Sequence, residues 1–358
     1  MTDTVYDDYN QDNHFGLELF DKTDLSKLSF IPSNLIKTLE CHRGFKDFNP
    51  DMSNKYYLYT GRGPSMGSFH IGHLLGLEFI LEFQKYIKNK IYFMISDDEK
   101  IFRDKISASE MDSNVTNTIE QLKKIGFDES NTNININSHG LSAEQYQLVI
   151  RLMSLTTLNK LEHIFGKKDN VGEYFYVFVQ MMPCFIEKGK QCIIIAGKDQ
   201  DPFFRLAREL AKRVGLPCPI IIYTKNVPGL DGSDKMSTSI PTSNPIFMSD
   251  TEQIIKNKVS SIRKVGAGTL DELFEHGSNL DVDIPFKLIE LFDKNEFNVG
   301  LIQKYYQKAQ LVNGEDLELI KSLVGEKGFK IRGDLMVITT FGVRTYLSNL
   351  LVKVISNY

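Results

Sequence analysis

The stretch YYLYTGRGPSMGSFHIGH (56–73) sets the fold of the region around it. Its first five residues are rich in tyrosine and apolar, which is typical of a buried strand. A turn containing Gly61 and Gly63 follows, and from His70 onward the apolar residues recur with helical spacing. A second buried-type strand, KIYFMIS (90–96), comes after that helix. The order strand, glycine turn, helix, strand indicates the opening of a doubly wound parallel sheet.

The same rhythm returns later in the chain. QCIIIAG (191–197) and CPIIIYT (218–224) read as strands, with a helical segment between them. Residues 27–40 predict a short turn leading into a helix, and residues 42–55 predict a turn-rich connection. Helical patterns fill the region from about 107 to 185, including one long helix over 142–166, and again from 246 to the end. The predicted fold class is therefore α/β: a Rossmann-like doubly wound parallel sheet with a helical insertion, plus a C-terminal all-helical domain.

Three domains are expected from these shifts in pattern. They are an N-terminal extension (1–55), a catalytic Rossmann domain (56–245, with the helical insertion at about 107–185) and a helical domain (246–358). The first 15 residues are polar and acidic, so we expect them to be mobile. They contain no apolar run of the kind found in signal peptides and presequences.

Composition limits the classes of function. The chain has 358 residues, 42% hydrophobic and 25% charged, which is ordinary for a globular protein with a sizeable core. A net charge of −4 excludes a generic polyanion binder, so any contact with nucleic acid must come from local patches. The four cysteines form no C-x-x-C pair, and no apolar run is long enough to cross a membrane. We therefore expect a cytoplasmic protein in a reducing compartment.

The histidine pair in HIGH (70–73) admits three interpretations. His70 and His73 share one face of a first helical turn, where N–H groups and the helix dipole favour an anion such as phosphate. Two surface histidines at an ordinary helix start would give the same sequence. A zinc site is disfavoured, because zinc-binding helices usually space their histidines by four with an acidic partner.

Two further segments offer chemistry. DGSDKMSTS (231–239) places Lys235 in a flexible loop with hydroxyl residues, where a lysine can move onto a phosphate; alternatively it is a solvated linker. AGKDQDPFFR (196–205) places Asp199, Gln200 and Asp201 just after a strand, at the edge where open α/β sheets bind ligands. That acidic run is also a normal start for a helix.

Together, HIGH (70–73) and KMSTS (235–239) are far more specific than either alone, and the chain resembles the class I aminoacyl-tRNA synthetases. Within that class it is similar to tryptophanyl-tRNA synthetases of the eukaryotic and archaeal type. The strings that carry this resemblance are YLYTGRGPS (57–65), SDDEK (96–100), KDQDPFFR (198–205), DKMSTS (234–239) and LDVDIPF (280–286).

The resemblance implies an aminoacyl-tRNA ligase that activates L-tryptophan with ATP and Mg²⁺ and transfers it to tRNA(Trp). It implies that His70, His73, Lys235 and Ser237 are catalytic, with the metal entering on ATP and no metal site of the protein's own. The implied ATP-binding residues are Thr60, Gly61, Arg62, Gly72, Met236 and Ser239. The implied residues for the amino acid are Tyr59, Met94, Glu99, Gln180 and Gln200.

The family also implies that the helical domain (246–358) binds the anticodon of the tRNA and that the chain forms a homodimer. Arg205 and Arg208 lie on one helical stripe that could touch tRNA or form a solvated basic face. Asp281 could accept from the amino group of a cytosine base, whereas Asp283 is better explained as a helix cap. Gln180 could equally be a polar residue on a packed helix.

Two departures from the family pattern concern the pocket. A glutamine is common at the position of Met94, and an apolar residue at that of Lys198. The segment 41–56 is also shorter than in related eukaryotic enzymes, so closure over ATP is expected to differ.

Three alternatives share parts of this pattern. Tyrosyl-tRNA synthetases have the same fold and signatures, although the strings at 57–65 and 198–205 favour tryptophan. A small-metabolite adenylyltransferase also uses H-x-G-H but needs no helical domain. A synthetase-derived binding protein would not need the intact His70, His73 and Lys235.

Overall fold

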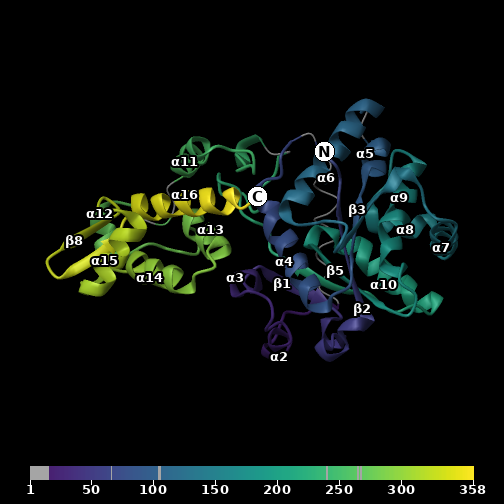
Figure 1. Ribbon diagram of the computed structural model, residues 1–358, viewed down its shortest axis with the longest axis horizontal. Coiled ribbons are helices and arrows are strands. Elements are labelled where there is room, and N and C mark those ends of the chain that lie inside the picture. Colours follow the sequence, from purple (N-terminus) through teal and green to yellow (C-terminus); the bar gives the residue numbers. More distant parts are fainter. Residues whose placement is uncertain (1–15, 66, 104–105, 239–240, 264–265, 267) are drawn as a thin grey trace. The chain divides into compact units, whose positions relative to one another are not determined.

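The computed structural model describes residues 16–358 except 66, 104–105, 239–240, 264–265 and 267 (Figure 1). The predicted mobility of residues 1–15 and the predicted ATP-binding residue Ser239 lie outside this range. The chain divides into two compact units. Unit 1 comprises the chain up to Ile31 together with Leu39–Ser68 and Gly76–Lys225; unit 2 comprises Pro32–Thr38, Phe69–Leu75 and Asn226–Tyr358.

Unit 1 contains a six-stranded sheet in the order β1-β6-β5-β2-β3-β4. All neighbouring strands run parallel except β1, which pairs with β6 in the antiparallel sense. This confirms the predicted Rossmann-like class. The strands are Leu39–Arg43 (β1), Tyr56–Arg62 (β2), Ile91–Ile95 (β3), Thr132–Ile136 (β4), Gln191–Gly197 (β5) and Ile220–Thr224 (β6).

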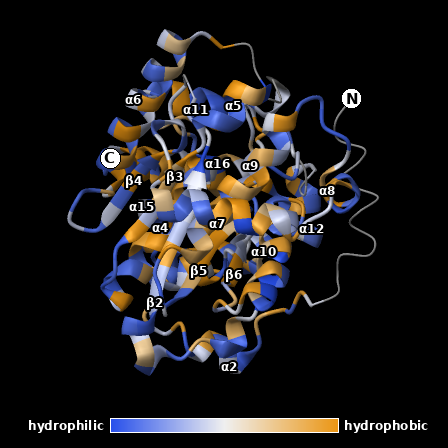
Figure 2. Ribbon diagram, turned by 90° about the vertical axis from the view of Figure 1, so that its right-hand side faces the viewer, coloured by the Kyte–Doolittle hydropathy of each residue, from blue (hydrophilic) through white to orange (hydrophobic). Residues whose placement is uncertain are grey.

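The central strands form because they are continuous apolar runs that can be buried on both faces. Residues 193–195 of β5 and 220–222 of β6 are isoleucines that are almost fully buried, and both strands are hydrophobic in Figure 2. The chain builds the sheet outward in opposite directions from β2 and β5, so their shared border is a topological switch point. Ligands of open α/β sheets bind at the carboxyl ends of strands at such a point.

Helices of unit 1 pack against this sheet. The cluster of buried side chains joins strand residues such as Tyr57 and Tyr59 to Val177, Phe178 and Phe204 on two helices. The longer helices are Ile71–Ile87 (α4, whose first residues belong to unit 2), Ala108–Ile125 (α6), Ala143–Ser154 (α7), Leu158–Phe165 (α8), Val171–Met181 (α9) and Asp201–Val214 (α10); the short ones are Lys22–Ser26 (α2) and Asp97–Arg103 (α5).

Three local predictions in unit 1 are wrong. Residues 39–43 are a strand where the sequence predicts the end of a helix and the start of a turn-rich connection, and residues 132–136 are a strand within the predicted helical insertion. Both are edge strands with several polar residues, and their pairing with the sheet overrides a weak local preference. The long helix expected after Ser142 is broken into α7 and α8, because the Thr157 side chain accepts from the backbone of Lys160 and starts a new helix.

Unit 2 is mainly helical, as predicted from residue 246 onward, but it is not all-helical. Strands β7, β9 and β8 form a small antiparallel sheet. The hairpin arises because Gly333, with φ of 58°, makes the turn between a strand that alternates apolar and basic residues, FKIR (329–332), and an apolar strand, LMVI (335–338). The elements are Ser33–Ile36 (α3), Glu252–Ser261 (α11), Leu270–His276 (α12), Ile284–Phe292 (α13), Glu296–Gln307 (α14), Gln310–Leu311 (β7), Gly314–Val324 (α15), Phe329–Arg332 (β8), Leu335–Ile338 (β9) and Thr340–Ser356 (α16).

The units differ in their borders from the expected domains. The long C-terminal segment of unit 2 begins at Asn226, whereas the sequence predicts a border at 245/246, and the unit also includes Pro32–Thr38 and Phe69–Leu75. The functional division into three domains stays a prediction. A search of the described residues finds no helix of the length and apolarity needed to span a bilayer.

Candidate active site

The two signature segments meet within unit 2. His70 is buried, and its ring centroid lies 3.6 Å from that of His73. The backbone N–H of His70 donates to Nδ1 of His73 at 3.3 Å, so the proton of the neutral His73 ring is on Nε2. A Cβ on Gly72 would lie 2.8 Å from the His70 ring and 3.4 Å from Cβ of Met236. The HIGH segment therefore packs directly against the KMSTS loop.

The KMSTS loop is held by its backbone. The Met236 N–H donates to the carbonyl of Val227 at 2.7 Å, and the Met236 side chain is buried. The Ser237 N–H donates to the hydroxyl of Ser243 at 3.3 Å, and that hydroxyl donates back to the Ser237 carbonyl. Lys235 is exposed beside this anchored pair. The loop thus fixes the backbone directly after the exposed lysine.

A further segment, not recognised from the sequence, joins the two signatures. Phe247 forms an antiparallel bridge with His70. The Ile71 N–H donates to the carbonyl of Ile246 at 2.9 Å, and the Met248 N–H donates to the carbonyl of Phe69 at 2.7 Å. These are backbone contacts without a side-chain signature, so no sequence pattern could have shown them.

In unit 1, three predicted amino-acid-binding residues come together. The Tyr59 hydroxyl donates to the backbone carbonyl of Gln180 at 2.9 Å, and burial raises the pKa of Tyr59 well above its usual value, which keeps it protonated. The side-chain amide of Gln180 donates to Oε1 of Gln200 at 2.7 Å. Oε1 of Gln180 is buried and, within the described part of the chain, accepts no hydrogen bond. A buried acceptor without a donor is costly, and an indole or ammonium N–H would satisfy it.

The end of β2 carries the predicted contacts to ATP that lie in unit 1. Gly61 is required there, because a Cβ would lie 2.7 Å from the carbonyl oxygen of Met94 on the adjacent strand. Met94 belongs to the same buried cluster as Tyr59, so it contributes an apolar surface. The Thr60 hydroxyl donates to the carbonyl of Ile195 at 3.1 Å, across the switch point. Burial lowers the pKa of Arg62 to about 10, which leaves it charged at neutral pH.

The three acidic residues at the start of α5 differ in their surroundings and contacts. Glu99 pairs with Arg103 at 3.1 Å and is partly exposed. Asp98 is buried, accepts from the amide of Asn137 at 2.9 Å, and has its pKa raised to about 6 by burial. Asp97 accepts from the backbone of Ser138 at 3.0 Å. The two aspartates therefore hold the turn that follows β4.

A buried ion pair involves Asp201, the residue that directly follows Gln200. Nε of Arg43 donates to Oδ1 of Asp201 at 2.6 Å, and Nη2 of Arg43 donates to Oδ2 at 2.8 Å. The Tyr223 hydroxyl also donates to Oδ1 of Asp201, at 2.6 Å. Asp201 is the first residue of α10, directly after Gln200. Sequence reasoning noted Asp201 but missed Arg43, which is 158 residues away along the chain.

The remaining predicted residues have these surroundings. Arg205 is half-buried, and desolvation lowers its pKa. Arg208 donates to the carbonyl of Pro219, so its guanidinium is partly engaged within the fold. Asp281 is exposed, whereas Asp283 caps α13 by accepting from the Phe286 N–H at 2.8 Å, as predicted.

Lys198, where the family has an apolar residue, lies 3.3 Å from Glu40 on β1. This position therefore ties the segment before Gln200 to the edge strand.

The sequence model of the family described as "tRNA synthetases class I (W and Y)" matches residues 52–317. The chain belongs to this family. Over 321 residues this chain is 31% identical to the tryptophan–tRNA ligase of Encephalitozoon cuniculi. The match covers 85% of this chain and 83% of that protein. This chain is 32% identical over 291 residues to the cytoplasmic tryptophan–tRNA ligase of Arabidopsis thaliana, covering 76% and 72%.

Solved structures agree with this placement. A crystal structure of tryptophanyl-tRNA synthetase from Encephalitozoon cuniculi bound to tryptophan superimposes with a TM-score of 0.80 at 28% identity, covering 98% of this class I synthetase and 93% of that chain. The enzyme from Giardia lamblia gives 0.80 at 27% identity. The resemblance inferred from HIGH and KMSTS is confirmed, as is the enzyme class, an aminoacyl-tRNA ligase.

Proposed function

We propose that this protein activates L-tryptophan with ATP to tryptophanyl-adenylate and transfers it to tRNA(Trp) in the cytoplasm. The observation that carries the proposal is the packing of Gly72 against Met236, which joins both class I signatures in one unit. The names of the relatives support tryptophan as the amino acid. Tyrosine activation on the same fold is the alternative.

Activation needs positioning and charge stabilisation more than acid–base chemistry. The carboxylate of tryptophan attacks the α-phosphorus, and pyrophosphate leaves, so no general base is required. Nε2–H of His73 and the His70 ring, which lie side by side, would donate to the phosphate as its negative charge grows. Lys235 and Ser237 would hold the leaving pyrophosphate, with Ser239 as a further donor, and Thr60, Gly61 and Arg62 would contact the nucleotide. Mg²⁺ would enter on the phosphate oxygens that it prefers.

The amino acid would be held by the group around Tyr59. Tyr59 and Met94 offer an aromatic and an apolar surface to the indole. The buried Oε1 of Gln180 is the acceptor for a ligand N–H, with Gln200 fixing the amide in place. Glu99 on α5 would supply a carboxylate for the ammonium group. A tyrosine side chain also carries a donor, its phenol O–H, so this acceptor alone does not separate the two amino acids and the exchange assay has to decide between them.

Substrate identity is tested by ATP–pyrophosphate exchange with each amino acid in turn. Tryptophan is expected to be the only one that supports exchange. Exchange with tyrosine alone would replace the proposal by its alternative, and exchange with no amino acid would favour a binding protein.

The phosphate role of the KMSTS loop is tested with Lys235→Ala. Removing one positioned donor typically costs about 3 kcal/mol in the barrier, so exchange should fall about 100-fold with little change in tryptophan affinity. The matched control is Lys256→Ala on α11, because this lysine forms an exposed ion pair with Glu252 on the same helix. Wild-type exchange in Lys235→Ala would remove this lysine from the mechanism.

For tRNA, we propose contacts from Arg205, Arg208 and Asp281. A double Arg205→Ala, Arg208→Ala variant should lose tRNA affinity more steeply at low salt than at high salt. Exchange without tRNA is the control for folding, because it depends on neither contact.

We also propose a homodimer. Tyr146, Ile150 and Met153 are exposed at 54%, 47% and 37% and follow one face of α7, which lies in the predicted insertion. Such a stripe is suited to burial against a second copy of the chain. Light scattering should show a dimer for the wild type and a monomer for Ile150→Glu, and a wild-type monomer would contradict the proposal.

A further inference from the structure

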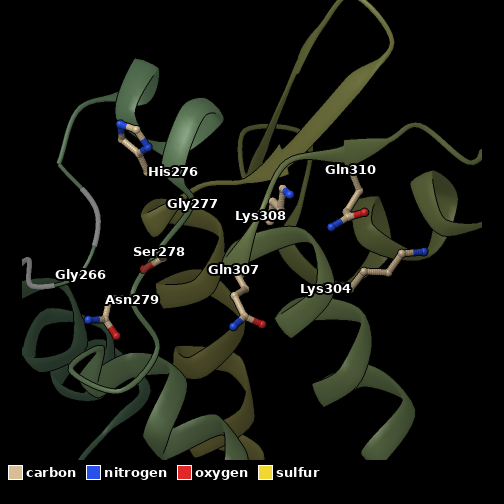
Figure 3. A pocket seen from close by; sticks show the side chains of 9 residues that line it. All are labelled: Gly266, His276, Gly277, Ser278, Asn279, Lys304, Gln307, Lys308 and Gln310. Atoms are coloured by element: carbon tan, nitrogen blue, oxygen red, sulfur yellow. The ribbon is translucent and has the colours of Figure 1, made fainter.

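A primary amide has a donor end and an acceptor end, and its hydrogen-bond partners decide which end it offers to a ligand. An open pocket of about 600 Å³ in unit 2 carries three such amides, from Asn279, Gln307 and Gln310 (Figure 3). Among the described residues that line this pocket there is no aspartate or glutamate whose side chain could orient them. The paired amides of Gln180 and Gln200 in unit 1 differ, because a carboxylate lies at one end of their chain of hydrogen bonds.

That carboxylate belongs to Asp199, which precedes Gln200 in the short turn Lys198–Gln200. Nε2 of Gln200 donates to Oδ2 of Asp199 at 3.3 Å. An ionised carboxylate only accepts hydrogen bonds, so the NH₂ end of Gln200 has to face Asp199. The oxygen of the Gln200 amide is thereby turned away from Asp199 and toward α9.

The next bond passes this polarity on to Gln180. Oε1 of Gln200 accepts from Nε2 of Gln180 at 2.7 Å, so Gln180 uses its NH₂ end on this side. Its own Oε1 is left as a buried acceptor that receives no hydrogen bond from the described residues. The hydroxyl of Tyr59 donates to the backbone carbonyl of Gln180 at 2.9 Å and holds the main chain in place. The direction of both amides is therefore set from the Asp199 end.

The carboxylate of Asp199 is kept within reach of Gln200 by the space above Gly197. A Cβ on Gly197 would lie 2.5 Å from Oδ1 of Asp199. Gly197 has φ of −73°, which any residue adopts, so glycine is needed here for space and not for conformation. The residue between them, Lys198, is tied to the edge strand β1 by its ion pair with Glu40 at 3.3 Å.

We propose that Asp199 is a positioning residue for amino-acid binding, whose carboxylate fixes the polarity of the two amides so that Oε1 of Gln180 faces an N–H of the ligand. Without the carboxylate, both amides can turn over together and keep the bond between them. Gln180 would then present its NH₂ end to the ligand N–H, and two donors would face each other. The inference rests on the proposed function, since it deepens the account of how the amino acid is held.

The first test removes or displaces the carboxylate and follows tryptophan-dependent exchange. In Asp199→Asn either direction of the amides is satisfied, so about half of the enzyme is competent and the KM for tryptophan should rise about twofold. Gly197→Ala should raise it by a similar factor, because its Cβ displaces the same carboxylate. The KM for ATP and kcat at saturating tryptophan should stay constant. The matched control is Glu209→Gln on α10, whose carboxylate pairs with Lys160 and which should leave both KM values unchanged.

The decisive test moves the carboxylate from one end of the chain of bonds to the other. In Gln180→Glu the new carboxylate meets the oxygen of Gln200 and turns away from it, so the KM for tryptophan should rise about tenfold. In the double variant Asp199→Asn, Gln180→Glu the Gln200 amide can turn over, donate to the new carboxylate and accept from the new amide. The KM should then return to within about threefold of wild type, whereas independent effects would multiply to about 20-fold.

Each result decides the inference. A KM for tryptophan that multiplies in the double variant would overturn it, as would a large rise in Asp199→Asn together with none in Gln180→Glu, the pattern of a carboxylate that contacts the ligand itself. Both outcomes would leave the proposed function intact. Absence of tryptophan-dependent exchange in the wild type would instead overturn the proposed function.

Discussion

The buried pair of Arg43 and Asp201 allows a stability effect and a substrate effect to be predicted together. Arg43 is 5% exposed, as is Asp201, and the carboxylate accepts bonds of 2.6 and 2.8 Å from Arg43 and 2.6 Å from Tyr223. In Arg43→Met the carboxylate stays buried without its cation. Breaking a buried pair in this way costs about 3–5 kcal/mol in the free energy of unfolding.

The companion variant, Asp201→Asn, removes the charge but keeps an oxygen that can accept from Tyr223. The double variant Arg43→Met, Asp201→Asn leaves neither ion unpaired, so it should lose less stability than the two single variants added together. We expect a coupling free energy of at least about 2 kcal/mol. Urea unfolding, followed by far-ultraviolet circular dichroism, measures the free energy of unfolding of the wild type, the two single variants and the double variant.

The substrate effect follows from the position of Asp201 at the start of α10, next to Gln200. Loosening that helix start should misplace the amide that accepts from Gln180 at 2.7 Å. We expect the KM for tryptophan to rise about tenfold in Arg43→Met, while the KM for ATP stays constant. Should Arg43→Met prove too unstable, Tyr223→Phe offers a milder loss of about 2 kcal/mol. Additive stability losses within about 0.5 kcal/mol would refute the reasoning.

Three shorter predictions address single contacts. Gly72→Ala should reduce exchange at least about tenfold, because its Cβ would lie 2.8 Å from the His70 ring, whereas Gly76→Ala on the same helix meets its nearest atom at 3.9 Å and should be active. Tyr59→Phe should lose about 1 kcal/mol of stability and raise the KM for tryptophan; Tyr57→Phe, which loses a bond of equal length to Pro183, should change stability alone. The pKa of Asp98 is raised to about 6, so its stabilising contribution is full below pH 4 and lost as pH rises through 6. Asp98→Asn should therefore be about 3 kcal/mol more stable than wild type at pH 8 and equal to it at pH 4, as measured by urea unfolding.

The sequence predicts the parts of the fold where side chains alone carry the information. Strands such as Ile220–Thr224 are continuous apolar runs, so they could be recognised without any partner. The edge strands Leu39–Arg43 and Thr132–Ile136 carry polar residues and exist only because a neighbour offers hydrogen bonds. Local patterns cannot report such a partner, which is why both were missed.

The candidate site shows the same limit. The signatures identify His70 and Lys235, and the family resemblance supplies Tyr59 and Gln180. No pattern indicates that Arg43 would meet Asp201, since burial of a charge becomes visible only when the fold brings its counter-ion to it.

The backbone bridge between His70 and Phe247 leads to a last prediction, on a residue that the sequence placed in the helical domain. Nζ of Lys258 donates to the carbonyl of Pro245 and to Asp250, each at 2.7 Å, and lies 4.8 Å from the centre of the Phe247 ring. Lys258 thus fixes both ends of the segment that bonds to the start of α4.

Replacing Lys258 with methionine keeps most of the unbranched side chain but removes charge-assisted bonds worth about 1.5–3 kcal/mol each, so the segment should shift and the HIGH turn with it. We expect tryptophan-dependent exchange, a reaction that needs no tRNA, to fall about tenfold in Lys258→Met. Lys256→Met, on the same helix, breaks only an exposed pair with Glu252 and should keep the wild-type rate. If Lys258→Met instead raised only the KM for tRNA, α11 would act as part of an RNA-binding domain, and the bridge would not be what holds the histidines in place.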